Sequence, residues 1–251
     1  MASHRAFTDH FGGRGMAYAR HRPTYPPALY RRVLAACRGR DLAWDCGTGS
    51  GQAARVLAAH FRAVVATDAS PGQIAAAPPT EGVAFLQAPA ERAPLRDASV
   101  DLITVAQALH WFDRDAFFAE VHRVLRPQGV LAVWTYDRPR LPGRLDAPLR
   151  RLHDDLLAPF WPPQRRLVSE RYAGIELPFE ALPVAHLEME RRWTPAELFA
   201  YLATWSAIPA AQAAGIDPWH ELRVMLADCG ERLRVRWPLT LRLSRRPEVS
   251  R

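Results

Sequence analysis

The sequence predicts an α/β protein with a mostly parallel sheet and a mainly helical cap, and three observations lead to this fold. Apolar runs suited to strands alternate with helical segments through the first half of the chain, which is typical of a parallel sheet. The strand runs, such as residues 100–106, are near-continuous apolar stretches, as burial on both faces requires. A glycine-rich turn directly follows the first strand run.

The first half of the chain is predicted to alternate helix and strand in a regular order. A helix over 27–37 precedes a strand over 41–46, a helix over 50–59, a strand over 63–67 and a short helix over 71–76. Strands over 83–87 and 100–106, a helix over 114–125 and a strand over 129–136 follow. The crossovers between parallel strands should be right-handed.

After Trp134 the composition changes, and the pattern predicts a lid with two further strands. Residues 138–163 are rich in proline and arginine and should form a loop leading to a short helix over 146–157. A strand is expected over 181–193, and Thr194-Pro-Ala-Glu197 predicts a capped helix that reaches Ser206. A helix over 218–229 precedes the run over 234–246, whose alternation predicts a half-exposed strand at the far edge of the sheet.

The length and composition are those of one domain. A chain of 251 residues with 49% hydrophobic content can bury a full core, and it contains no internal repeat. We expect the core to span about 41–137 with the strands over 181–193 and 234–246. The cap would then comprise about 1–40 and 138–230 without the 181–193 strand.

The loop Trp44-Asp-Cys-Gly-Thr-Gly-Ser-Gly51 is the most informative motif. Its glycines permit a sharp turn from strand to helix and let a ligand lie against free backbone amides. A dinucleotide fingerprint would need a glycine where Gln52 stands, and a phosphate-binding P-loop would need a lysine, which the chain lacks. A nucleoside without phosphates fits this loop better.

Asp68 supplies a second part of the predicted nucleoside site. It ends the next strand run, 21 positions after Gly47, where a carboxylate can accept hydrogen bonds from two ribose hydroxyls. The alternative is that Asp68 only caps the helix beginning near Pro71.

These motifs resemble the class I S-adenosylmethionine-dependent methyltransferases. The resemblance rests on the glycine loop, the Val-Val-Ala-Thr-Asp-Ala-Ser strand end and the segments Ala90–Asp113 and Leu125–Leu131, and it covers residues 44–133. Arg22-Pro-Thr-Tyr-Pro26 and Ala106-Gln-Ala-Leu-His-Trp-Phe-Asp113 are similar to the small-molecule branch that includes trans-aconitate methyltransferase-like proteins. The resemblance implies a Rossmann-like sheet with an antiparallel last strand and helices that partly cover the active site.

The positions of the strand ends and the family resemblance together predict a cofactor site. Ligands of open α/β sheets bind at the carboxyl ends of the strands, so side chains just after the strands should converge there. The resemblance implies an S-adenosylmethionine site with the amino-acid part near Asp45 and Gly47, the ribose on Asp68 and the methionine portion over Gln107. The expected cofactor-binding residues are Tyr18, Arg22, Asp45, Gly47, Gly49, Gln52, Asp68, Ala69, Ala90, Glu91 and Gln107.

Two of these assignments have a structural alternative. Ala90 and Glu91 would lie beside the adenine, but Glu91 could equally be a surface carboxylate at a helix start. Arg22, near Tyr18 in the segment expected to fold over the cofactor, could bind a carboxylate of cofactor or substrate with both arms of its guanidinium. It could also be a surface arginine beside a proline-rich turn.

His110 is the candidate catalytic residue. It follows the fourth strand, close to the expected methyl group, and could serve as a base for a hydroxyl or amine acceptor. A carboxylate or thiolate acceptor needs no base, and His110 would then only shape the pocket. Trp111 and Phe112 are expected as pocket walls, where an aromatic face could contact the sulfonium.

Charge, cysteine content and hydropathy bear on possible partners and on location. The net charge is +7 and the pI is near 10.0, yet the arginines are scattered among acidic residues and form no stripe. We therefore favour the amino-acid bias of a GC-rich genome over a nucleic-acid-binding surface as the origin of the charge. Three widely spaced cysteines predict neither a disulfide framework nor a metal site. No apolar run is long enough for a membrane span and no signal core is present, so we expect a cytoplasmic protein.

The sequence therefore predicts transfer of a methyl group to a small molecule, with carboxylic acids as the first acceptors to test. Three alternatives remain open at this point. They are a nucleic-acid or protein methyltransferase, a non-catalytic S-adenosylmethionine-binding protein and a nicotinamide oxidoreductase. The sequence does not decide the oligomeric state.

Overall fold

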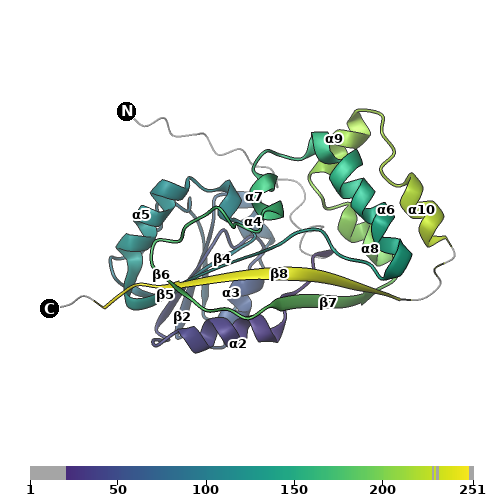
Figure 1. Cartoon of the computed structure of the whole chain (residues 1–251). Helices are drawn as coiled ribbons and strands as arrows, with labels where there is room; N and C mark the ends of the chain where they lie inside the picture. Colours follow the sequence, from purple (N-terminus) through teal and green to yellow (C-terminus); the bar gives the residue numbers. More distant parts are fainter. Residues whose placement is uncertain (1–20, 228, 230–231, 249–251) are drawn as a thin grey trace.

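An eight-stranded mixed sheet forms the centre of the molecule (Figure 1). The computed structural model describes residues 21–227, 229 and 232–248. The strand order is β3-β2-β1-β4-β5-β8-β6, and β7 also pairs with β8. The strands are β1 Leu42–Cys46, β2 Ala63–Asp68, β3 Val83–Gln87, β4 Val100–Ala106, β5 Leu125–Tyr136, β6 Glu180–Leu182, β7 Leu187–Trp193 and β8 Leu233–Arg245.

The first five strands are parallel, and the last three add antiparallel pairs. β1 pairs with β2 and β4 so that Asp45 lies opposite Ala66 on one side and Thr104 on the other. β8 runs antiparallel to β5, β6 and β7. This mostly parallel sheet with an antiparallel C-terminal strand confirms the predicted fold class. Because the parallel strands end at one edge, the loops that follow β1, β2 and β4 lie together.

Helices cover both faces of the sheet. The strand residues alternate between two apolar clusters, with Ala43 in one and Trp44 in the other. On one face, α2 (Pro27–Ala36) contributes Val33 to the same cluster as α3 (Gln52–Leu57). On the other, Phe117 of α5 (Arg114–Val124) packs against Trp44 with 6.2 Å between ring centroids. Burial on both faces explains why the strands are nearly continuous apolar runs.

The cap is a group of short helices beyond the carboxyl edge of the parallel strands (Figure 1). It includes α6 Asp146–Arg151 with a π-helical turn at Leu152–Leu156, α7 Arg165–Ser169, α8 Pro195–Leu202, α9 Ala207–Ala213 and α10 His220–Leu226. The remaining helices are α4 Pro71–Ala76 beside the sheet and 3-10 turns at Leu109–Trp111, Gly143–Leu145 and Ala158–Phe160. The predicted cap at Thr194 is present, because Thr194 Oγ1 accepts from Glu197 N and Glu197 Oε2 accepts from Thr194 N.

Several element boundaries differ from the prediction. The strand expected over 181–193 is split into β6 and β7, with Pro183 following β6, because proline cannot donate to a strand ladder. The helix expected to reach Ser206 ends at Leu202, and neither α7 nor α9 was expected. β8 does not form the sheet edge, because β6 and β7 pair along its outer side.

The helices of the described part of the chain are all short. No helix within it is both long and apolar enough to cross a membrane.

Candidate active site

The glycine loop, residues 44–51, makes the turn from β1 to α3 in a conformation that side chains disfavour. Gly47, Gly49 and Gly51 have φ values of +66°, +55° and +78°. A Cβ atom on Gly47 would lie 2.6 Å from Ala108 Cβ, and one on Gly51 would lie 2.6 Å from Phe85 Cε1. The loop therefore requires glycine for its backbone conformation and, at two positions, for close packing.

Asp45 holds this loop to the sheet through its own carboxylate. Its Oδ2 accepts hydrogen bonds from Thr48 Oγ1 at 2.5 Å and from Ala54 N at 3.2 Å, and its Oδ1 accepts from Thr104 Oγ1 at 2.6 Å. The side chain is buried, and this burial raises the pKa of Asp45 to about 6 against the lowering effect of the hydrogen bonds. Asp45 thus fixes the loop, and direct contact with a cofactor stays a prediction.

Asp68 joins the end of β2 to the glycine loop. Its Oδ2 accepts from Gly49 N at 2.9 Å, and its Oδ1 accepts from Ser70 N at 2.9 Å. The bond from Ser70 N is a local turn just before α4. The alternative role of Asp68, as the cap of this helix, differs from the structure in that Ser70 occupies the N-cap. Asp68 therefore ties the end of β2 to the glycine loop, and its contact with a ribose stays a prediction.

Gln73 is a polar side chain of this region that the sequence did not single out. It lies on α4, is 4% exposed, and its Oε1 has no hydrogen-bond partner among the described residues. A Cβ atom added to Gly49 would lie 3.6 Å from this oxygen, so Gln73 faces the glycine loop. A buried amide oxygen without a donor is rare and indicates a ligand or a water that supplies one.

The other predicted cofactor residues tie neighbouring loops together. Gln52 Nε2 donates to Pro23 O at 3.2 Å, and Ala69 O accepts from Gln87 Nε2 at 3.3 Å. Ala90 is buried, and Glu91 Oε1 accepts from Asp113 N at 2.9 Å at the start of α5. Glu91 therefore binds the backbone at the N-terminus of α5. Phe112, which lies just before this helix, has its ring close to Gly47.

Gln107 directly follows β4 and lies in the left-handed region, with φ of +56°. Such a conformation costs about 1–2 kcal/mol for a residue other than glycine. Its side chain is held at both ends, because Nε2 donates to Tyr136 O at 2.7 Å and Oε1 accepts from Thr135 Oγ1 at 2.6 Å. Strain of this kind persists where the surrounding structure fixes it, as at ligand sites.

His110 lies beside Gln107 in a buried, neutral state. Its Nδ1 is 2.8 Å from Tyr172 Oη, and the tautomer determines which of the two donates. Burial, with a smaller contribution from Arg165, lowers the pKa of His110 to about 3. The ring is therefore uncharged at neutral pH and a very weak base, which argues against the role of general base.

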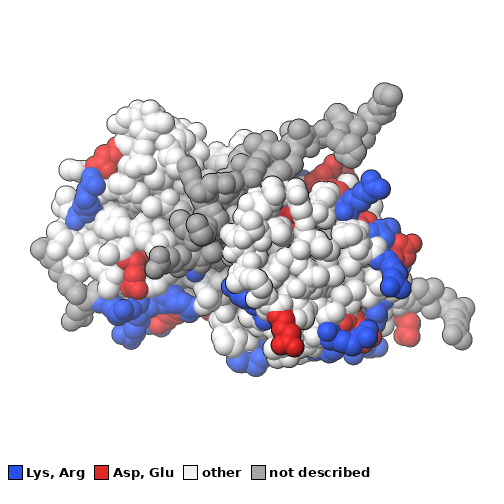
Figure 2. Space-filling model, turned by 180° about the vertical axis from the view of Figure 1, so that it is seen from behind, with Lys and Arg blue, Asp and Glu red and all other residues white. Residues whose placement is uncertain are grey.

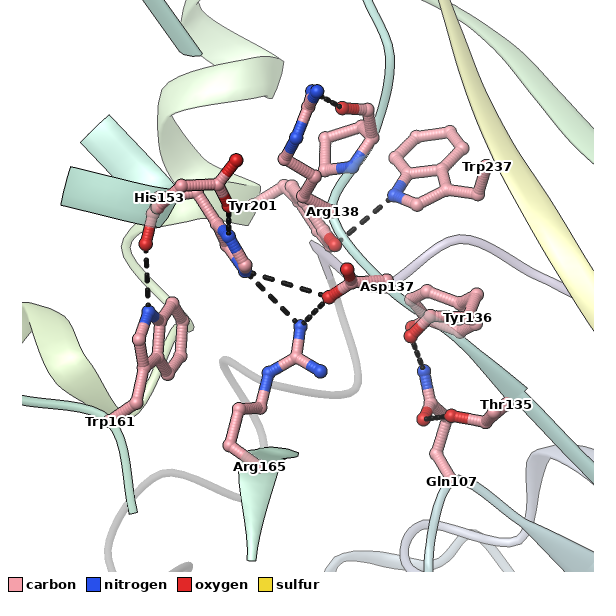
Figure 3. Close-up of polar contacts among 12 residues, drawn as sticks. Gln107, Thr135, Tyr136, Asp137, Arg138, His153, Trp161, Arg165, Tyr201 and Trp237 are labelled. Carbon is pink, nitrogen blue, oxygen red and sulfur yellow. Dashed lines mark hydrogen bonds and ion pairs between the residues drawn. The ribbon is translucent and has the colours of Figure 1, made fainter. Parts of the chain in front are cut away.

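A cavity of about 70 Å³ lies next to these residues, under the cap. We call it the cap cavity. Its walls combine three tryptophans, two tyrosines and two arginines with a few polar side chains, as Figure 3 shows in part. The lining residues are Arg22, Gln107, His110, Trp111, Tyr136, Asp137, Trp161, Arg165, Val168, Tyr201, Thr204, Trp205 and Ser206.

The segment before α2 reaches this cavity through Arg22. Arg22 Nη1 donates to Tyr136 Oη at 3.4 Å, and the guanidinium lies 5.4 Å from the centroid of the Tyr201 ring. Arg22 is therefore partly buried against the wall of the cavity and is not a fully exposed surface arginine. Tyr18 lies outside the described residues.

The sequence missed most of the cap cavity. Asp137 directly follows β5, so the rule on strand ends could have found it. Trp161, Arg165, Tyr201 and Trp205 come from cap segments that approach only in the folded chain, and no local pattern marks them. Cys46, by contrast, is buried with a raised pKa, in agreement with a packing role.

Comparisons with known proteins agree with this architecture. A family model described as a methyltransferase domain matches residues 44–133. A protein of Dictyostelium discoideum named as a methyltransferase is 35% identical over 213 residues, which cover 83% of this chain and 81% of that protein. A Mycobacterium tuberculosis protein named as an uncharacterized methyltransferase is 42% identical over 144 residues, 55% of this chain and 57% of its own length.

One solved structure is similar over nearly the whole described chain. It is a protein from Anaeromyxobacter dehalogenans, described as a type II methyltransferase, with 42% identity and a TM-score of 0.83. The alignment covers 90% of this chain and 99% of that one.

Proposed function

Because this chain belongs to the class I S-adenosylmethionine-dependent methyltransferases, we propose that it transfers a methyl group to a small carboxylic acid bound in the cap cavity. The cavity carries this proposal, since it is small, is lined on one side by residues of the cap and reaches Gln107 and His110 on the other. The segments 22–26 and 106–113, which resemble the trans-aconitate methyltransferase-like branch, contribute Arg22, Gln107, His110 and Trp111 to its walls.

The cofactor half of the proposal rests on the residues around the glycine loop. S-adenosylmethionine, when bound, supplies a methyl group activated by the sulfonium. The glycine loop lies beside the end of β2, where the Asp68 carboxylate accepts from Gly49 N, and a carboxylate at this position suits the binding of ribose hydroxyls. The unpartnered Oε1 of Gln73 beside Gly49 supports a ligand with an N–H or O–H donor at this place.

The acceptor half rests on the state of His110. A carboxylic acid has an ordinary pKa near 4 and is ionised at neutral pH, so its oxygen needs no base to attack a methyl group. His110 is neutral and hydrogen-bonded to Tyr172, which suits a wall residue that positions the acceptor and keeps water out. We therefore assign His110 to acceptor positioning rather than proton removal.

The distribution of charge favours a small acceptor over a nucleic acid. On the face shown in Figure 2, basic and acidic side chains are interspersed and form no continuous basic stripe. Arginines of the β7–β8 ribbon are paired with acids, as Arg234 is with Glu190 at 2.7 Å. The expected cytoplasmic location and the absence of a nucleic-acid or membrane partner stay predictions.

Calorimetry tests the cofactor half first. The purified protein should bind S-adenosylmethionine and S-adenosylhomocysteine with one-to-one stoichiometry and micromolar affinity, and a nicotinamide dinucleotide should not bind. Binding of the dinucleotide alone would sink the assignment of the glycine loop.

Methyl transfer tests the acceptor half. Cofactor with a labelled methyl group would be incubated with a panel of small di- and tricarboxylic acids and with the corresponding amides. Label should appear in ester products of the acids and not in the amides. Cofactor binding without transfer to any acid, together with transfer to hydroxyl or amine compounds, would restore His110 as a candidate base.

A further inference from the structure

Arg165 on α7 is held in a fixed position between the cap and the end of β5. Its Nη2 donates to Asp137 Oδ1 at 2.5 Å and lies 3.4 Å from His153 Nε2 (Figure 3). The guanidinium carbon is 5.2 Å from the centroid of the Trp161 ring. Trp161 is itself anchored, because its Nε1 donates to His153 O at 3.0 Å. The guanidinium is thus positioned by an ion pair on one side and an aromatic face on another.

One arm of this guanidinium is left without an acceptor. Arg165 Nη1 is buried and has no hydrogen-bond partner among the described residues. In Figure 3 it is turned away from Asp137, to the side on which Tyr136 and Gln107 lie. An unsatisfied buried donor on a charged group is costly, and native structures rarely keep one without a ligand, an ion or a water to complete it.

The surroundings of Arg165 suggest the chemistry of that ligand. Five aromatic side chains line the cap cavity with it, namely Trp111, Tyr136, Trp161, Tyr201 and Trp205. Flat rings bind a planar, apolar body, and a guanidinium arm binds an oxyanion. A second guanidinium, that of Arg22, lines the same cavity, and Asp137 already accepts from the other arm of Arg165.

We propose that Arg165 is the specificity-determining residue of the acceptor site and that its Nη1 binds a carboxylate on a planar acceptor. This carboxylate is an anchor distinct from the oxygen that is methylated, because an oxygen ion-paired to a guanidinium is a poor nucleophile. The reacting oxygen lies nearer Gln107 and His110. The inference rests on the proposed function of the cap cavity.

Binding of a matched pair of probes tests this role. Benzoate and its neutral isostere benzamide would be titrated into protein saturated with S-adenosylhomocysteine, with tryptophan fluorescence and calorimetry as readouts. Wild-type protein should bind benzoate at least tenfold more tightly than benzamide. Arg165→Gln should abolish this preference and leave benzamide affinity unchanged, and Arg165→Lys should restore part of it.

The neighbouring residue provides the control. Arg166 is 79% exposed and pairs with Glu170 on the surface of α7, so Arg166→Gln should keep the full preference for benzoate. Melting temperature and S-adenosylhomocysteine affinity, unchanged in Arg165→Gln, would show that the variant is folded. A structural role alone would not alter discrimination between a charged and a neutral probe.

The outcomes separate this inference from the proposed function. Equal binding of both probes to wild-type protein, no binding of benzoate, or a preference retained in Arg165→Gln would each overturn the role of Arg165. If such protein still binds S-adenosylhomocysteine and methylates an acid, only this inference fails. If it does neither, the proposed function fails as well.

Discussion

The glycine loop and the cap cavity differ in where their polar groups find partners. In the loop, both oxygens of Asp45 accept hydrogen bonds from the chain itself, from Thr48, Ala54 and Thr104. In the cap cavity, Arg165 keeps one buried donor without a partner among the described residues. Beside the loop the unpartnered atom is the neutral amide oxygen of Gln73, whereas in the cavity it is the charged guanidinium nitrogen of Arg165. In the proposed function, this difference means that the loop contributes a fixed backbone to cofactor binding and the cavity contributes side-chain charge to acceptor binding.

The largest effect on stability and cofactor binding is expected from adding one methyl group to the glycine loop. Gly47→Ala would add a Cβ 2.6 Å from Ala108 Cβ at a φ of +66°. Backbone strain and overpacking together should cost about 4 kcal/mol of unfolding free energy and abolish S-adenosylhomocysteine binding in calorimetry. Gly49→Ala is the control, because its Cβ would meet only Gln73 Oε1, at 3.6 Å. Equal losses in both variants would show that backbone strain alone decides.

A second test concerns the buried carboxylate of the loop. The pKa of Asp45 is raised from 3.8 to about 6, so between these values the native state holds a proton that the unfolded chain releases. The stability gained from this group is complete below about pH 4 and is lost as pH rises to about 6, by up to ~3 kcal/mol.

Asp45→Asn removes this titration. Urea unfolding of both proteins at pH 4 and pH 7 should show wild type losing stability relative to the variant at the higher pH. A difference that stays constant with pH would mean that Asp45 is ionised throughout and that its hydrogen bonds outweigh burial.

A smaller effect is expected from the neutral hydrogen bond between Tyr172 and His110, which lines the cap cavity. Tyr172→Phe would remove the hydroxyl 2.8 Å from His110 Nδ1 and cost about 1 kcal/mol in chemical unfolding. Tyr30→Phe is the matched control, because the buried Tyr30 hydroxyl has no partner among the described residues and its loss should be neutral or stabilising. A larger loss of unfolding free energy in Tyr30→Phe than in Tyr172→Phe would contradict the expectation that only the hydrogen-bonded hydroxyl stabilises the fold.

The smallest effect is expected on the outer surface of the cap. Arg151 of α6 and Glu221 of α10 are both more than half exposed and lie 2.9 Å apart. Arg151→Gln should cost less than about 0.5 kcal/mol and nothing at high salt. Arg138→Gln should cost more, because Arg138 is 11% exposed and contacts both oxygens of Asp146. Similar costs for the two variants would show that burial does not decide the value of these pairs.

The parallel half of the fold could be predicted because its signals are local. The continuous apolar runs gave β3 and β4 with their exact bounds, and Pro71 marked the start of α4. In the cap the signals conflict. Pro209 lies inside the first turn of α9, where proline is tolerated, but in the sequence it indicates an interruption. The position of β8 inside the sheet depends on pairing with β6 and β7, which no single segment encodes.

The site divides in the same way. Gly47, Gly49, Asp68 and Gln107 lie at or just after the ends of strands, so their meeting at one edge could be derived from topology. The unpartnered atoms of Gln73 and Arg165 could not, because a missing partner is a property of the packed chain.

β8 belongs to two parts of the molecule at once. Its residues 239–245 pair with β5 in the sheet, and residues 233–239 pair with β7 in the ribbon below the cap (Figure 1). A shift of one residue would exchange the faces of both pairings together. This single strand therefore sets the position of the ribbon, and of the cap above it, relative to the sheet, so that a change in its register would move both together.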